Sequence, residues 1–166
     1  TPNGGYQFVS WGGQVSGTTN QIVVTMNTNK TVVPRFRVPG DDFEQRIQLG
    51  GATVTYTGLQ NTGATKETGE PNHAGNPGGK SLWWTWTAPA SGAATLTTAG
   101  SNFRNALAVY TGATVSNLTT VATNLAGVGT NTSAVAFAAV GGTTYHFAVD
   151  GFNGTNGSVV LNLSLP

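Results

Sequence analysis

Along most of the chain, apolar and polar residues alternate one by one in short stretches. In residues 157–166 the large apolar side chains occupy every second position: Val159, Leu161, Leu163 and Leu165. A period of two is that of a β-strand with one buried face. Apolar residues nowhere recur with helical spacing over three turns, and Gly, Asn and Pro separate the alternating stretches. The pattern therefore predicts an all-β fold.

Further strands are predicted from the same alternation. Their inward-facing residues are Leu96, Leu107 and Val109, Val135 and Phe137, and Tyr145, Phe147 and Val149. The pair Gly141-Gly142 predicts a turn between the last two of these strands. Many short strands at spacings of about 8–15 residues are typical of antiparallel sandwiches and jelly rolls. We therefore expect an antiparallel β-sandwich of jelly-roll type.

The stretch KSLWWTWTAPASG (80–92) holds three tryptophans in four positions. In a strand, Leu82, Trp84 and Trp86 share one face, which we expect to lie in the core. Trp83 falls on the opposite face, among Ser and Thr residues. An outward-facing ring at this position would be able to stack on a sugar. The candidate ligand-binding residues are accordingly Trp83, Tyr110 and His146.

The first forty residues have a different pattern. The segments YQFVSWGGQVSG and IVVTMNTNKTVVPRFRV predict a compact hairpin element that ends at Val38. The following VPGDD (38–42) has the turn chemistry and charge of a linker. We therefore predict a small β element over residues 1–39 and a sandwich domain over residues 40–166.

The composition excludes several classes of function. Only 8% of the residues are charged and the net charge is +1, with the Lys and Arg residues scattered. Nucleic-acid binding, which normally needs a basic patch, is not expected. No apolar run approaches the roughly 20 residues of a membrane span. Because there is no cysteine, disulfides and thiolate metal sites are excluded. The chain starts at Thr1 without a Met, so we expect a mature or excised piece of a longer protein.

Five segments between residues 41 and 166 form a recognisable set: DDF (41–43), GATKETGEPNHAG (63–75), SLWWTWTAPASG (81–92), LAVYTG (107–112) and TTYHFAVDG (143–151). With these segments, residues 41–166 resemble the bacterial pre-peptidase C-terminal (PPC) domain. The resemblance implies a jelly-roll sandwich that serves as a non-catalytic appendage of exported enzymes or surface proteins. Relatives include modules that bind collagen or polysaccharide, and some that bind calcium.

The N-terminal part of the chain contains the segments YQFVSWGG, SG and VTMNTNKTVVPRF. With these segments, residues 6–38 resemble the closing half of an internalin-type B-repeat, a small β-module of surface proteins. The opening strands of such a repeat would precede Thr1. The resemblance therefore implies that this element has an unpaired sheet edge or takes a strand from elsewhere.

Calcium is the one cofactor for which the resemblance provides a candidate. Calcium takes six to eight oxygen ligands, several of them from loop carboxylates. The candidate ligands are Asp41, Asp42, Glu67 and Glu70. In the other interpretation, Glu67 and Glu70 cap loop amides while Asp41 and Asp42 are solvated linker charges. Two acidic positions common in relatives are absent, since this chain has SNFRN at 101–105 and NLA at 124–126.

Enzymatic chemistry finds little support in the sequence. Glu70 and His73 have the Glu-x-x-His spacing, but Pro71 and the nearby glycines preclude the helix on which such a pair binds zinc. Four residues of strand would separate His146 from Asp150 by roughly 13 Å. No Ser lies in a Gly-x-Ser-x-Gly elbow. We therefore expect no catalytic residues.

The leading hypothesis is a secreted or cell-surface attachment module of an exported bacterial protein. Its partner would be an extracellular polysaccharide, a protein matrix or the cell envelope. The alternative is a self-assembling subunit of an extracellular filament or surface layer, in which copies of the chain pair their strands. A third hypothesis is a chaperone-like or sorting segment that is removed after export.

Overall fold

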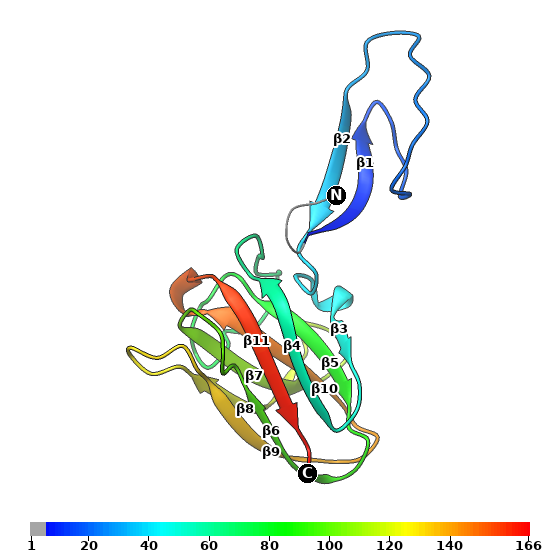
Figure 1. Ribbon diagram of the computed structural model, residues 1–166. Coiled ribbons are helices and arrows are strands. Elements are labelled where there is room, and N and C mark those ends of the chain that lie inside the picture. Colours follow the sequence, from blue (N-terminus) through cyan, green and yellow to red (C-terminus); the bar gives the residue numbers. More distant parts are fainter. Residues whose placement is uncertain (1–5) are drawn as a thin grey trace.

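The computed structural model describes residues 6–166 and consists mainly of two packed β-sheets (Figure 1). The strands of this sandwich are β3 (Ile47–Leu49), β4 (Thr53–Gln60), β5 (Leu82–Thr87), β6 (Gly92–Thr97), β7 (Asn105–Thr111), β8 (Thr119–Leu125), β9 (Ala134–Ala139), β10 (Thr144–Gly151) and β11 (Ser158–Ser164). Two short 3-10 turns, η1 (Phe43–Gln45) and η2 (Phe152–Gly154), complete it. The start at Thr1 lies outside the described residues. No helix in the described part is long and apolar enough to cross a bilayer.

The strand order is that of a jelly roll. A five-stranded sheet has the order β3-β5-β10-β7-β8, and a four-stranded sheet has the order β4-β11-β6-β9. All neighbours pair antiparallel except β3, which runs parallel to β5. From β4 to β11 the chain changes sheet at every connection except the one between β7 and β8. The predicted all-β jelly-roll sandwich is thereby confirmed.

The main core lies between the two sheets and follows the sequence alternation. Leu82, Trp84 and Trp86 are fully buried in it, so the predicted core face of the tryptophan-rich strand is confirmed. The predicted inward residues of β11 (Val159, Leu161 and Leu163) meet them from the opposite sheet. The indole Nε1 of Trp86 donates a hydrogen bond to the carbonyl of Gly51 at 2.8 Å. Large rings with a bonded polar atom are well suited to such a core.

The N-terminal element is a two-stranded antiparallel sheet that projects from one end of the sandwich (Figure 1). It consists of β1 (Gln7–Gly13) and β2 (Val32–Arg37), with a register shift between Phe8 and Ser10. Phe8 packs its ring against Trp11 and Phe36. Among the described residues no third strand joins this sheet. The predicted hairpin is present, although its second strand begins only at Val32.

Candidate functional site

The connection between β4 and β5 folds back over the outer face of the five-stranded sheet. We call residues 61–80 the covering loop. Its glycines and prolines prevent regular structure. Beneath it lies a second apolar cluster formed by Phe43, Trp83, Ala108, Tyr110 and Ala148. Two of these residues are alanines on neighbouring strands, which leaves room for the loop to approach the sheet.

The prediction that Trp83 presents its ring to solvent is wrong. The alternation placed Trp83 correctly on the outer face of the sheet, but its side chain is fully buried. Phe43 and His73 cover the ring in edge-on contacts, with centroids 5.1 and 5.2 Å away. Tyr110 and His146 are also buried, at 1% and 5% exposure. The three candidate ligand-binding rings therefore form no exposed platform, and their role in binding stays a prediction.

A chain of hydrogen bonds fastens the covering loop to β7. The Nδ1 atom of His73 lies 2.8 Å from the hydroxyl of Tyr110, and its Nε2 atom lies 2.8 Å from Oε1 of Glu70. A neutral imidazole with its proton on Nε2 satisfies both contacts, since Tyr110 then donates to Nδ1. Burial, with the nearby carboxylates of Glu70 and Asp150, raises the pKa of Tyr110 above its ordinary value. The phenol therefore stays neutral and keeps its proton for His73.

The same chain continues from the loop to η1. The other oxygen of Glu70 accepts the backbone N–H of Glu67 at 2.8 Å. The carboxylate of Glu67 in turn accepts the backbone N–H of Phe43 at 2.6 Å. Each acidic side chain thus satisfies a backbone donor that would otherwise be orphaned near the buried cluster. The result is a continuous link between β7, the covering loop and the turn that carries Phe43.

Asp150, at the end of β10, anchors the other end of the covering loop. Its carboxylate is fully buried and accepts backbone N–H groups of Gly79, Lys80 and Gly151 at 2.7–3.1 Å. Multiple backbone donors are the usual way to compensate a buried carboxylate. Gly78 has a positive φ, and any Cβ at that position would collide with the same carboxylate. A glycine is therefore required where the loop meets Asp150.

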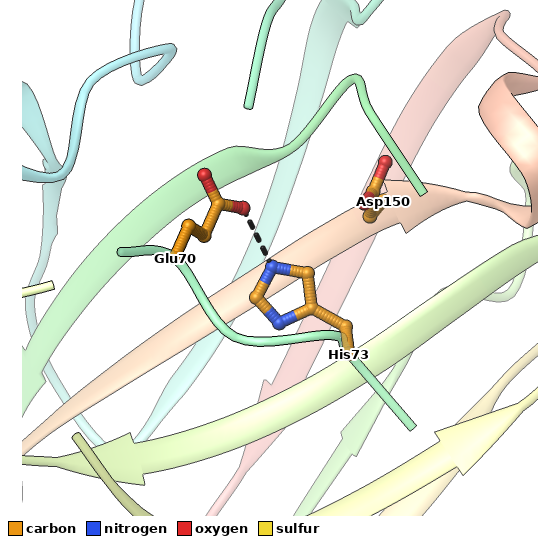
Figure 2. A group of neighbouring side chains, drawn as sticks. All are labelled: Glu70, His73 and Asp150. Atoms are coloured by element: carbon orange, nitrogen blue, oxygen red, sulfur yellow. Dashed lines mark hydrogen bonds and ion pairs between the residues drawn. The ribbon is translucent and has the colours of Figure 1, made fainter. Parts of the chain in front are cut away.

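Glu70, His73 and Asp150 form the group of described residues closest to a metal-site geometry. One potential ligand atom from each lies within 4.8 Å of the others. Figure 2 shows Glu70 directed at the imidazole from one side while Asp150 lies on the other. Both ring nitrogens and both carboxylates already have hydrogen-bond partners. The donor set therefore fits a hydrogen-bonded fastening better than a zinc ion, which would displace Tyr110 or backbone donors.

The four acidic residues proposed for calcium come near one another. Burial raises the pKa of both Asp41 and Glu67 above the ordinary value, and the negative charges of the neighbouring carboxylates raise it further. Asp41 accepts the N–H and hydroxyl of Thr65, and Glu67 and Glu70 accept the backbone bonds described above. The capping interpretation thus describes Glu67 and Glu70, whereas Asp41 also caps a loop residue and is not a purely solvated charge. As placed, they do not present a set of free oxygens to one point, and the calcium role stays a prediction.

Replacing Glu67 by Gln is expected to flatten the pH dependence of stability. A carboxyl whose folded pKa is raised contributes stability below its ordinary pKa of 4.5, and this contribution is lost as the pH rises through the folded value. Gln keeps an oxygen for the N–H of Phe43 but does not titrate. Urea denaturation between pH 4 and 7 should therefore show a smaller loss of stability for E67Q than for the natural chain. An equal loss of stability with rising pH in E67Q and the natural chain would contradict this prediction. The variant Glu44→Gln, which replaces an exposed glutamate, provides the control.

His146 lies on the outer face of β10 beside the same cluster. Its Nε2–H donates to the carbonyl of Gly112 at 2.9 Å, so the neutral ring carries its proton there. Burial, and secondarily the charge of Arg46, lower the pKa of His146. Its Nδ1 atom has no hydrogen-bond partner among residues 6–166. Phe43 packs edge-on against the ring at 5.0 Å, which places His146 in the wall of the buried cluster.

Sequence reasoning missed the partners that complete this cluster. Glu70 and His73 were visible as a pair, but Asp150 and Tyr110 come from strands far along the chain. No local spacing indicates that these four residues meet. In the sequence, only Asp150 indicated that a buried polar cluster exists, because a lone acidic residue at the end of an apolar strand requires a compensating partner.

Comparison with known proteins gives no assignment: no family model matches the chain, and no curated protein matches it in sequence.

Proposed function

We propose that this chain is a non-catalytic attachment module of an exported bacterial protein. One observation carries the proposal: the outer face of the four-stranded sheet is broad, neutral and rich in small hydroxyl side chains. The outward side chains of its three neighbouring strands β4, β11 and β6 are Thr53, Thr55, Thr57, Gln60, Ser158, Val160, Asn162, Ser164, Ala93, Thr95 and Thr97. The titratable groups beneath the covering loop, by contrast, are buried and already bonded, which supports a structural role for them.

Strand pairing arranges these side chains in rows across the face. Asn162 lies between Thr55 and Thr97, and Ser164 lies between Thr53 and Thr95. Asn162 is held in place, because it accepts the Thr55 hydroxyl and donates to the carbonyl of Ala99, both at 3.0 Å. Hydroxyl groups donate and accept hydrogen bonds, as the hydroxyls of a neutral polysaccharide do. A neutral polymer of this kind, or an equally neutral matrix protein, is therefore the partner that the face fits best.

Binding should be lost when the hydroxyls of this face are replaced. The triple variant T55V/T95V/T97V keeps the β-branched shape that suits a strand and removes three hydroxyl groups. Pull-down on insoluble glycans, collagen and cell walls, followed by calorimetry on any hit, should show at least about a tenfold weaker affinity, one net hydrogen bond being worth about 1 kcal/mol. T123V on β8 is the control and should bind normally. No binding of the natural chain to any member of the panel would contradict the proposal.

A self-assembling filament subunit is the second candidate, and the N-terminal element favours it. Six exposed large apolar residues gather there: Tyr6, Val9, Val23, Met26, Val33 and Phe36. A two-stranded sheet is marginally stable alone, so strands from a neighbouring copy would both cover these residues and complete the sheet. Electron microscopy of native material beside light scattering tests this candidate. Ordered fibres or layers would support it, and dispersed monomers at high concentration would exclude it.

A further inference from the structure

The free edge of β9 lacks the features that normally keep a sheet edge from pairing with another chain. Edge strands are usually short, charged, interrupted by proline or twisted by a bulge. β9 has the sequence AVAFAA, and all six residues pair with β6 without a register shift. Among the described residues β9 forms a backbone ladder with no strand other than β6. The edge strand of the other sheet, β8, differs because its pairing with β7 contains an irregularity.

The hydrogen bonds of β9 show which backbone groups face outward. The N–H of Thr98 donates to the carbonyl of Ser133 at 2.9 Å, so these two residues form a hydrogen-bonded pair. Bonded and non-bonded pairs alternate along an antiparallel ladder, so Val135, Phe137 and Ala139 also bond toward β6. The backbone groups of Ala134, Ala136 and Ala138 therefore point to the free edge. The N–H of Ala134 confirms this direction, because it lies 3.3 Å from the side-chain oxygen of Asn124 on the other side.

Of these outward groups, only the N–H of Ala134 is covered by a side chain of the described residues, that of Asn124 on β8. Ala134, Ala136 and Ala138 are all exposed, and each carries a single methyl group. Val140, directly after the strand, is 57% exposed, and Val128, in the connection from β8, is 90% exposed. Figure 1 places β9 at the margin of the sandwich away from β1 and β2. A second strand could thus approach the edge at Ala136 and Ala138, and at Ala134 it would replace Asn124 as the partner of the N–H.

The charge along the edge of β9 bears on which strand would pair with it. When a strand pairs with its own copy across a two-fold axis, every charged residue at the centre meets its like, which costs energy. Residues 105–149 contain no Asp, Glu, Lys or Arg, and this range includes all of β7, β8 and β9 and most of β10. The edge thus carries nothing that opposes self-pairing. It also offers nothing to attract a charged partner.

We propose that β9 pairs with β9 of a second copy of this chain, antiparallel across a two-fold axis centred on Ala136. The two four-stranded sheets would then form one continuous sheet of twice the width. This pairing is independent of the proposed attachment function. It is also distinct from assembly through β1 and β2, which lie at the far end of the sandwich.

A single cysteine tests the register of the pair. The chain has no cysteine, so Ala136→Cys introduces its only thiol. Directly opposite residues in a hydrogen-bonded antiparallel pair have Cα atoms about 5.5 Å apart, within the range that a disulfide spans. Under mild oxidation A136C should become a covalent dimer on a non-reducing gel, also at protein concentrations where random collision is negligible. Thr55→Cys, on the same face but on the opposite edge strand β4, is the control and should stay monomeric.

Proline at the same position tests whether β9 carries the association. Ala136→Pro removes an N–H that points to the free edge of the described sheet, and edge strands tolerate proline there. It removes two symmetry-related hydrogen bonds from the dimer, so the dissociation constant should rise about tenfold to a hundredfold in analytical ultracentrifugation. The thermal melt of the A136P monomer verifies that the sandwich is intact, and Ala136→Lys provides a second variant should proline unfold it.

The outcomes separate the alternatives. A concentration-dependent dimer that crosslinks through A136C and dissociates with A136P or A136K supports the proposal. A chain that remains monomeric at millimolar concentration overturns it. Assembly that persists unchanged in both edge variants also overturns it and indicates the N-terminal element instead.

Discussion

Replacing Trp83 by alanine is expected to lower the free energy of unfolding by about 3–5 kcal/mol, the usual cost of truncating a buried tryptophan. The ring lies outside the main core, yet it is fully buried between Phe43, His73 and Tyr110. Its removal would leave a cavity between the sheet and the covering loop. Urea denaturation monitored by circular dichroism measures the loss.

Trp84→Ala provides the matched comparison, since Trp84 is equally buried in the main core. Comparable losses for the two variants are expected, because burial rather than the choice of sheet face determines the cost. A W83A chain as stable as the natural one would show that the covering loop does not close over the sheet. In that case the ring would again be available to a ligand.

Replacing Asp150 by alanine should be as damaging as the loss of Trp83. The carboxylate accepts three backbone N–H groups in a fully buried position, and each buried donor left without a partner costs about 1–3 kcal/mol. We expect a total loss of about 3 kcal/mol or more and release of the covering loop. Denaturation measures the first, and limited proteolysis within residues 61–80 measures the second.

Two further variants make this prediction specific to the anchor. Asp42→Asn removes a half-buried linker charge and should change stability by no more than about 0.5 kcal/mol. Gly78→Ala leaves Asp150 in place but introduces a Cβ that collides with its carboxylate, so it should reproduce the proteolytic sensitivity. If D150A were as stable and protease-resistant as D42N, Asp150 would not be the anchor.

Alternation predicted which face of each strand a residue occupies, and this prediction held for Trp84, Trp86 and the leucines of β11. The alternation could not predict what covers the outer face. Trp83 is buried because the covering loop is fastened to Tyr110 and Asp150, which are 27 and 67 residues further along the chain. Such contacts depend on the closed fold, and no local pattern encodes them.

The acidic residues illustrate the same limit. The sequence indicated that Glu67 and Glu70 lie in one loop, but it left two roles open. Backbone hydrogen bonds support capping by both residues, and the bond of Glu67 depends on where Phe43 comes to lie. Composition indicated a weakly charged surface as a whole, but only the strand order revealed that the uncharged β9 forms a free edge.

The position of β11 has a consequence for how the chain folds. β11 is the last strand in chain order, yet it lies between β4 and β6 in the four-stranded sheet. The four-stranded sheet therefore cannot be completed before β11 is in place, because β4 and β6 have no direct pairing to hold them together. Folding of the sandwich thus depends on a contact between segments that lie about 100 residues apart in the chain, which is expected to slow it.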